Sequence, residues 1–366
     1  MFFGKNVVFR VDASLSIGTG HVMRCLTLAD ELSKRGAICY FVTRPHPGNA
    51  INAIEKRGFR CLILPSNEYA VNDASKGYED WLGCTQEIDS KETLEILDNI
   101  TVNLIIIDHY ALDIVWESAV KASTTYIAVI DDLANRKHFC NFILDQNAGR
   151  SWDDYKLLLP EKCITLFGPG YSLLRDEFSE YRNASINKKE RGKLTSILIS
   201  LGGIDKDNIT SEVMDSLSEC GLPDECELTI VMGGKSPWIE VVRSNADKLP
   251  WNYNLFVDTT EMAKLLSHSD IAIGAAGSSA WERCAMGVPT IMIVVADNQK
   301  IIAENLLKSN AAFIINLEEN VKNKIIHCFD LIHENPEILE QMSYFSSLLT
   351  DGKGAEKVVT ELEKLR

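Results

Sequence analysis

The stretch that decides the fold is residues 6–26, which have the sequence NVVFRVDASLSIGTGHVMRCL. It begins as an apolar strand at residues 6–9, and Gly18 and Gly20 form the turn that follows. The next apolar side chains recur at helical spacing, at Val22, Cys25, Leu26, Ala29 and Leu32. The order of strand, glycine turn and helix predicts the opening unit of a parallel α/β sheet, with backbone N–H groups at the helix start free to face an anion.

His21 lies in the first turn of this predicted helix. A helix N-terminus disfavours an imidazolium, so we expect His21 to be neutral and able to accept a proton as a general base. Asp12, Ser14 and Arg24 gather around the same strand end, which favours a catalytic role over that of an exposed turn residue. Position 23 is a methionine where the dinucleotide-binding fingerprint needs a third glycine, so no cofactor is expected.

Composition limits the class of protein. The chain has 366 residues, 46% of them hydrophobic and 24% charged, which is typical of a globular protein of two domains. A net charge of −15 argues against nucleic acid as a partner. Ten cysteines without a C-x-x-C pair indicate reduced thiols, and no apolar run approaches the ~18 residues of a membrane span. We therefore expect a cytoplasmic monomer that binds neither nucleic acid nor membrane.

Strands alternate with helices along the whole chain, which predicts mostly parallel sheets covered by helices on both faces. The polar stretch 183–193 lacks an apolar period and separates two similar halves. We predict an N-terminal domain at 1–182, a linker at 183–193 and a C-terminal domain at 194–350. A final helix at 351–366 would cross back, and a ligand cleft would lie between two Rossmann-like domains. The polar segment 66–83 matches no motif.

Candidate site residues of the first half follow strand ends, where open parallel sheets bind ligands. Asp108 and Tyr110 come directly after the apolar strand 102–107. Either Asp12 or Asp108 is expected to orient the His21 imidazole. Another strand ends in Asp131-Asp132, but no third ligand lies at a useful spacing, so we expect no metal site.

Glycine loops also follow the strands of the second half, at 202–203, 233–234 and 274–279. Small residues let the backbone approach a ligand closely. Ser278 or Ser279 can cap the next helix, whose N-terminus would attract a diphosphate, and the Glu282 carboxylate suits ribose hydroxyls. The substrate-binding candidates of the whole chain are Gly18, Gly20, Arg24, Gly203, Met232, Gly277, Ser278, Glu282, Asn298 and Gln299.

Several of these motifs together resemble the UDP-sugar hydrolases of pseudaminic acid biosynthesis. The resemblance rests on residues 10–14 and 17–26, on 107–110, 171–178 and 200–203, and on 277–283 and 298–299. The loops of the second half are similar to a wider group, the glycosyltransferases of the GT-B fold. The resemblance implies two Rossmann-like domains in a GT-B-type arrangement, with UDP held mainly by the C-terminal one.

The resemblance also implies an activity that needs no metal. Water would hydrolyse UDP-2,4-diacetamido-2,4,6-trideoxy-β-L-altropyranose to UDP and the free sugar. Carried over from the resemblance, His21 would be the base, while Glu282 and Asn298 would contact the UDP or the sugar. The catalytic candidates beside His21 are Asp12, Asp108 and Tyr110.

Three other functions fit the same residues. A GT-B glycosyltransferase would use a sugar or lipid hydroxyl in place of water, and a hydrolysing UDP-sugar 2-epimerase would also release UDP. A non-catalytic nucleotide-sugar sensor would bind UDP without turnover, and it would give His21 no role.

Overall fold

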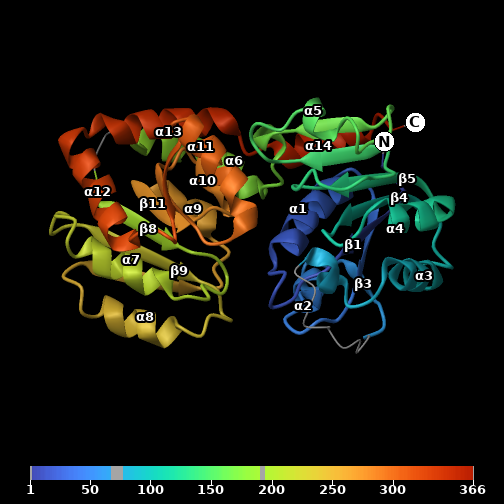
Figure 1. The fold of residues 1–366 in the computed structure, drawn as a ribbon, viewed down its shortest axis with the longest axis horizontal. Coiled ribbons are helices and arrows are strands. Elements are labelled where there is room, and N and C mark those ends of the chain that lie inside the picture. Colours follow the sequence, from blue (N-terminus) through green and yellow to red (C-terminus); the bar gives the residue numbers. More distant parts are fainter. Residues whose placement is uncertain (1, 67–76, 190–193, 366) are drawn as a thin grey trace. The chain divides into compact units, whose positions relative to one another are not determined.

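The computed structural model of the chain describes residues 2–66, 77–189 and 194–365, and Figure 1 shows its elements. The chain forms two compact units. The N-terminal unit comprises Met1–Leu173 with Gly354–Arg366, and the C-terminal unit comprises Leu174–Lys353. Each unit is built on its own parallel sheet, so the predicted pair of Rossmann-like α/β domains is confirmed.

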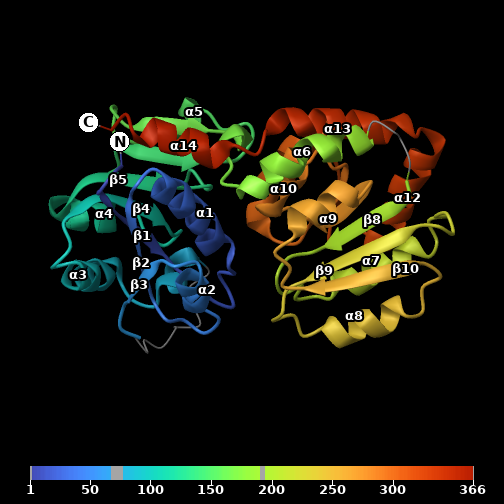
Figure 2. The same ribbon diagram turned by 180° about the vertical axis from the view of Figure 1, so that it is seen from behind.

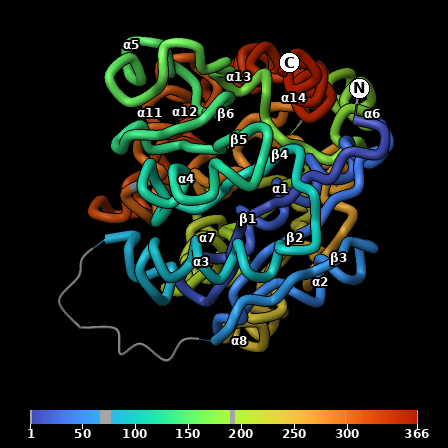
Figure 3. The backbone as a smooth tube through the Cα atoms, turned by 90° about the vertical axis from the view of Figure 1, so that its right-hand side faces the viewer, coloured from blue at the N-terminus to red at the C-terminus, as the bar shows by residue number. Residues whose placement is uncertain are grey.

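The described part of the N-terminal unit contains a seven-stranded sheet in the order β3-β2-β1-β4-β5-β6-β7, and the tube in Figure 3 follows it from β6 to β3. All pairs are parallel. The strands are β1 (Asn6–Val11), β2 (Ile38–Thr43), β3 (Arg60–Ile63), β4 (Val102–Asp108), β5 (Thr124–Ile130), β6 (Phe142–Asp145) and β7 (Ile164–Phe167). The helices are α1 (Gly20–Lys34), α2 (Ile51–Lys56), η1 (Tyr78–Leu82), α3 (Gln86–Ile96), α4 (Ile114–Val120), η2 (Lys121–Ser123), α5 (Trp152–Tyr155), η3 (Pro169–Tyr171) and α14 (Gly354–Leu362).

Alternate residues of each strand feed two separate cores, because side chains of a strand point to opposite faces. Val7 and Phe9 of β1 pack with α1, α2 and α14, whereas Val8 packs with residues of α4 and with Leu82 of η1. The strands are therefore apolar on both faces, as a sheet covered by helices on both sides requires.

The last helix returns to the first unit. Val358, Val359 and Leu362 of α14 are buried in the same core as α1, and Figure 2 shows the two helices side by side. Arg35, just after α1, donates to the Glu363 carboxylate and to the Glu356 carbonyl. The final helix of the chain thus completes the N-terminal unit.

The described part of the C-terminal unit contains a six-stranded parallel sheet in the order β10-β9-β8-β11-β12-β13. The strands are β8 (Ser196–Ser200), β9 (Glu227–Met232), β10 (Asn252–Val257), β11 (Ile271–Ala275), β12 (Thr290–Val294) and β13 (Ala312–Asn316). The helices are α6 (Asp176–Lys189), α7 (Ile209–Leu217), α8 (Ile239–Ala246), α9 (Met262–His268), α10 (Ser279–Ala285), η4 (Asp297–Gln299), α11 (Lys300–Lys308), α12 (Val321–Glu334) and α13 (Glu337–Leu349).

The predicted domain limits need correction. Residues 183–189 are not a linker, because α6 runs through them and packs on α9, α10 and α13 of the C-terminal unit. Apolar and polar contacts both hold the helix: Phe178 is fully buried, Arg182 donates to the carbonyl oxygens of Ser347 and Thr350, and Ser185 donates to that of Met286. The unit therefore begins at Leu174, and residues 190–193 of the predicted linker lie outside the described residues.

Candidate active site

The turn before α1 is closed by its own residues. The Ser14 hydroxyl accepts the N–H groups of Ser16 and Ile17, and the Gly18 N–H donates to the Ser14 carbonyl. Gly18 has a φ of +76°, a conformation that glycine adopts without strain. Helix α1 then begins at Gly20, so His21 lies in its first turn as predicted.

Asp108, the last residue of β4, binds both His21 and Arg24. Its Oδ1 atom lies 2.7 Å from His21 Nδ1, and Arg24 donates Nε to Oδ2 at 2.6 Å and Nη2 to Oδ1 at 2.6 Å. Strands β1 and β4 are neighbours with Val11 opposite Asp108, which brings the start of α1 to this carboxylate. Of the two carboxylates expected to orient His21, the structure therefore selects Asp108.

The charge state of Asp108 fixes the tautomer of His21. Burial raises the pKa of the Asp108 carboxyl, but the charges of Arg24 and His21 outweigh burial and lower that pKa below its usual value of 3.8. An ionised carboxylate only accepts hydrogen bonds, so Nδ1 of His21 carries the proton. Nε2 of a neutral His21 is then the basic nitrogen, and the side chain is 12% exposed.

Tyr110 and Asp132 complete the cluster. The Tyr110 hydroxyl donates to Asp132 Oδ2 at 2.9 Å, and Arg24 Nη1 donates to the same oxygen at 2.5 Å. The Tyr110 ring lies edge-on to the His21 imidazole, with 4.7 Å between ring centroids. Burial and the neighbouring Asp132 raise the pKa of Tyr110 well above its usual value of 10, so its hydroxyl remains a donor. The structure thus brings together His21, Arg24, Asp108 and Tyr110.

Asp12 lies in a different network, which corrects its expected place beside His21. Its Oδ1 atom accepts the Thr43 hydroxyl and the Arg44 N–H, and it forms an ion pair with Arg10 at 2.7 Å. His109 Nε2 lies 3.3 Å from Asp12 Oδ2. The carboxylate is fully buried, so it supports the ends of β1 and β2.

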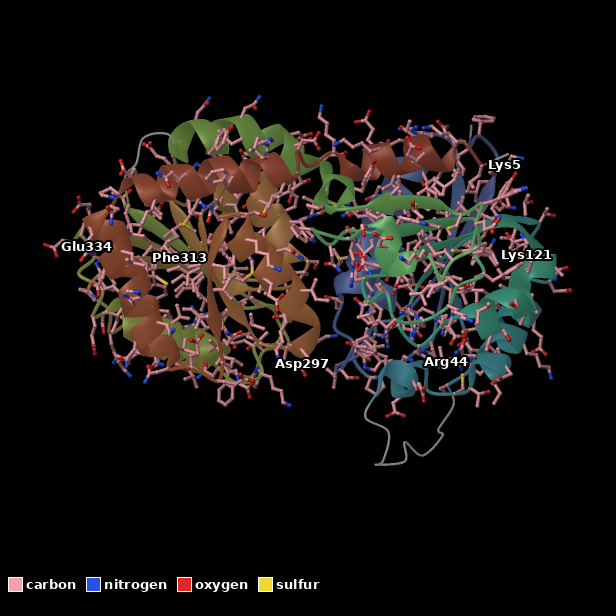
Figure 4. The ribbon with its side chains drawn as sticks, turned by 45° about the horizontal axis from the view of Figure 1, so that its top comes forward. Lys5, Arg44, Lys121, Asp297, Phe313 and Glu334 are labelled. Carbon is pink, nitrogen blue, oxygen red and sulfur yellow. The ribbon has the colours of Figure 1, made fainter. Side chains whose placement is uncertain are left out.

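The same network continues to Asp89 of α3, which sequence reasoning missed. Arg10 donates Nε and Nη2 to this carboxylate, Arg44 donates Nη2, and Trp116 donates its indole N–H at 2.9 Å. Arg44, labelled in Figure 4, comes from the loop after β2, at the other end of the sheet from Lys5. The buried arginine of an apolar strand, Arg10, is the signal that could have pointed to a buried partner.

The sequence did not predict that Asp132 and Trp81 belong to the His21 cluster, where Asp132 binds Arg24 and Tyr110 and the Trp81 ring lies edge-on to the imidazole. Asp132 was considered only as half of a metal-binding pair, and Trp81 belongs to the segment without a motif. Residues 67–76 of that segment lie outside the described residues, whereas residues 78–82 form η1.

Glycine loops follow the strands of the C-terminal unit. A Cβ atom at Gly233 would overlap the carbonyl oxygen of Gly203, so the loops after β8 and β9 approach each other closely. The Met232 side chain is buried in the hydrophobic core of this unit. These loops present backbone atoms at the carboxyl edge of the sheet, where α/β folds bind ligands.

The loop between β11 and α10 is held by a buried arginine. Arg283 donates Nη2 to the Ala275 carbonyl at 2.6 Å and Nη1 to the Ser279 hydroxyl at 3.2 Å. Burial lowers the pKa of Arg283 to about 10. Ser278 directly precedes α10, but its side chain makes no capping hydrogen bond to the helix. The prediction that Ser278 caps this helix is therefore wrong, and its side chain is exposed.

Glu282 lies one turn into α10 and is partly exposed. Burial raises the pKa of its carboxyl to about 7, although Arg175 and Arg283 oppose the shift. Gln299 accepts the Val295 N–H, and a Cβ at Gly277 would lie 3.9 Å from Gln299 Nε2, so the loops after β11 and β12 are neighbours. Asn298 belongs to the short helix η4.

Within residues 2–66, 77–189 and 194–365, no group of three or more histidine, cysteine, aspartate or glutamate side chains is arranged to hold a metal ion. The helices formed by these residues include none with the length and apolarity to cross a membrane.

Comparisons with known proteins agree with this geometry. Residues 198–358 match the glycosyltransferase family 28 C-terminal domain. The chain is 28% identical over 302 residues to the UDP-2,4-diacetamido-2,4,6-trideoxy-beta-L-altropyranose hydrolase of Campylobacter jejuni, covering 82% of this chain and 96% of that protein. It is 29% identical over 204 residues to the spore coat polysaccharide biosynthesis protein SpsG of Bacillus subtilis, covering 54% of this chain and 58% of SpsG.

Among solved structures, MurG of Acinetobacter baumannii has the same fold. The TM-score is 0.74 at 14% identity, over 98% of this chain and 99% of MurG. The chain therefore has the fold of the GT-B glycosyltransferases, and its second half is similar to the family 28 C-terminal domain. Over most of its length it is similar to the Campylobacter UDP-sugar hydrolase.

Proposed function

We propose that this chain is a UDP-sugar hydrolase that cleaves UDP-2,4-diacetamido-2,4,6-trideoxy-β-L-altropyranose into UDP and the free sugar. The observation that carries the proposal is the His21–Asp108 pair, which leaves a basic nitrogen at a partly exposed position. A relative that matches 82% of this chain is a hydrolase of that substrate.

The N-terminal unit supplies the base. Nε2 of His21 takes a proton from water as the water oxygen bonds to the anomeric carbon, and the bond from that carbon to the phosphate oxygen breaks with its electron pair going to UDP. The ionised Asp108 stabilises the imidazolium that forms and keeps the ring in one orientation. Arg24 balances the charge of Asp108 and is fixed in turn by Asp132.

The C-terminal unit binds the UDP portion. Its glycine loops offer backbone N–H groups to the diphosphate, and Glu282 hydrogen-bonds the ribose hydroxyls. With a pKa of about 7, Glu282 is present in both protonation states at neutral pH and can accept or donate there. The resemblance of residues 277–283 and 298–299 to the hydrolases supports this division of roles.

Substitution of His21 tests the proposal. Because general-base help contributes about 10²–10⁴-fold, His21→Asn should lower the rate of UDP release by at least 10²-fold. The matched control is His327→Asn, since His327 is an exposed histidine on α12. The rate is measured by coupled detection of UDP. Full activity of His21→Asn would refute the role of His21.

The identity of the reaction is tested separately by proton NMR of the wild-type reaction without any acceptor. Release of UDP with free 2,4-diacetamido-2,4,6-trideoxy-altrose of unchanged configuration at carbon 2 is the expected result. A product inverted at carbon 2 would identify an epimerase, and turnover that requires an added acceptor would identify a transferase. Addition of EDTA should leave the rate unchanged.

A further inference from the structure

Aromatic side chains from η1 surround the candidate base. Trp81 stacks on Tyr110 with 5.6 Å between ring centroids and an interplanar angle of 23°. It also meets His21 edge-on at 6.2 Å. Tyr78 lies edge-on to both Trp81, at 4.8 Å, and Tyr110, at 5.0 Å. Three aromatic rings and the imidazole therefore form one cluster.

Trp81 and Tyr78 are not part of the hydrophobic core. Leu82 is the buried residue of η1, whereas the side chains of Trp81 and Tyr78 remain partly exposed. Tyr110 is fixed from behind by its hydrogen bond to Asp132 and by the Arg136 guanidinium 5.9 Å from its ring centroid. The cluster is thus a supported apolar surface beside the imidazole.

In the proposed reaction, the attacked sugar lies within reach of a water on His21 and therefore beside this surface. The Nδ1 side of the ring is closed by Asp108 and Arg24, and the Tyr110 ring covers one edge of it. The faces of aromatic rings favour apolar C–H groups, and a hydroxyl held against a ring face loses its hydrogen bonds to water. The trideoxy sugar of the proposed substrate carries a methyl group at carbon 6 and two acetamido methyl groups.

We propose that Trp81 and Tyr78 are specificity-determining residues that form the apolar wall of the sugar subsite and select sugars with a methyl group at carbon 6 over sugars with a hydroxymethyl group there. This inference rests on the proposed function and adds to it the source of sugar selectivity. Selectivity arises because the methyl group buries apolar surface on the ring faces, whereas the hydroxymethyl group would press its hydroxyl against a ring face and lose hydrogen bonds to water there.

The test compares kcat/KM for the trideoxy UDP-sugar with that for its 6-hydroxy analogue. A single group in an apolar pocket discriminates by roughly 10–200-fold, so the wild type should prefer the trideoxy substrate within that range. Trp81→Ala should reduce the preference to less than about 5-fold by raising KM for the trideoxy substrate, while product inhibition by UDP stays unchanged. Trp81→Phe should keep most of the preference, and Tyr78→Ala should have an intermediate effect.

The matched control is Trp152→Ala, which removes a 42%-exposed tryptophan from α5 of the same unit. It should retain the wild-type preference, and far-UV circular dichroism checks that each variant is folded. A folded Trp81→Ala variant with the wild-type preference would overturn the inference.

Saturation-transfer NMR with the free trideoxy sugar gives a readout that does not depend on turnover. In the wild type and in His21→Asn, the methyl protons should receive the strongest transfer, and Trp81→Ala should lose it. A wild type that hydrolyses neither substrate would contradict the proposed function, and in that case the NMR experiment still decides the inference. Equal saturation transfer to the sugar-ring protons and the methyl protons, in the wild type and in all variants, would overturn the inference about Trp81 and Tyr78.

Discussion

At the scale of single residues, the proposed chemistry depends on one carboxylate that binds a histidine and an arginine together. Asp108 is held ionised by Arg24 and His21 although it is buried, and this charge determines which nitrogen of His21 is basic. A substitution that removes the charge of Asp108 but keeps its shape therefore tests whether the carboxylate orients the His21 imidazole or only fills space.

We expect Asp108→Asn to lower kcat by about 10²–10⁴-fold, because an amide can donate to Nδ1 and so stabilise the unproductive tautomer. The measurement is the rate of UDP release at saturating substrate. Asp132→Asn is the matched control, since it removes the charge of the second carboxylate that pairs with Arg24 and leaves the bond to Nδ1 intact. If both variants lose the same activity, the charge balance of Arg24 and not the orientation of the imidazole is responsible.

Glu282 provides a second prediction at this scale. Its pKa is about 7 in the folded chain against an ordinary value of 4.5, so between these values the folded state binds more protons than the unfolded state. Stability contributed by this residue should therefore fall as the pH rises from 4.5 to 7 and stay constant above.

Glu282→Gln should remove this dependence, so its melting temperature should exceed that of the wild type increasingly across the same window. Thermal unfolding at a series of pH values measures the difference. Glu240→Gln, at an exposed position on α8, is the control and should follow the wild-type curve. A constant difference between Glu282→Gln and the wild type at all pH values would contradict the assignment.

At the scale of elements, buried ion pairs join helix α3 to strand β1. Asp89 accepts hydrogen bonds from Arg10, Arg44 and Trp116, and its side chain is fully buried. Because the change weakens charged hydrogen bonds but leaves Arg10 paired with Asp12 and Arg44 paired with Glu92, we expect Asp89→Asn to lower the free energy of unfolding by about 1.5–3 kcal/mol.

Urea unfolding followed by circular dichroism measures this loss. Glu95→Gln is the matched control on the same helix, where Glu95 forms an exposed pair with Lys91 at 3.9 Å. Such surface pairs contribute only about 0–1 kcal/mol, so the control should unfold close to the wild type. Equal stability of Asp89→Asn and Glu95→Gln would show that the network does not hold α3 to the sheet.

At the scale of the whole molecule, the chain enters the C-terminal unit once and returns to the N-terminal unit with α14. Val358, Val359 and Leu362 of α14 are each less than 3% exposed. Burying a valine or leucine side chain stabilises the folded state by roughly 1.5–3 kcal/mol. A chain that ends at residue 353 should therefore have an N-terminal unit destabilised by several kcal/mol.

Hydrogen–deuterium exchange resolved by peptide measures where the loss occurs. Faster exchange in α1 and β1, with unchanged exchange in α7 and α12, is the expected pattern, so the C-terminal unit is its own control. Faster exchange confined to the C-terminal unit would contradict the assignment of α14 to the first core.

The sequence by itself determined the elements whose signals are local. Alternating apolar strands and amphipathic helices predicted two parallel α/β units, and the strand–glycine–helix order placed His21 in the first turn of α1. The sequence also placed Asp108 at the end of an apolar strand. It could therefore be assigned to the ligand-binding edge of the sheet, because the carboxyl ends of parallel strands lie at that edge. The polar helix α6 escaped prediction, since its sequence has no apolar stripe and several of its contacts are hydrogen bonds to distant carbonyl groups.

Only the tertiary structure decided which groups meet. His21 and Asp108 are 87 residues apart, and the choice of Asp108 over Asp12 follows from the order of β1 and β4 in the sheet and from the competing bonds of Asp12. The aromatic cluster around His21 and the return of α14 likewise join distant segments. The periodicity of apolar residues shows which face of a helix or strand is apolar, but it does not show which other element covers that face. These contacts are therefore determined only by the tertiary structure.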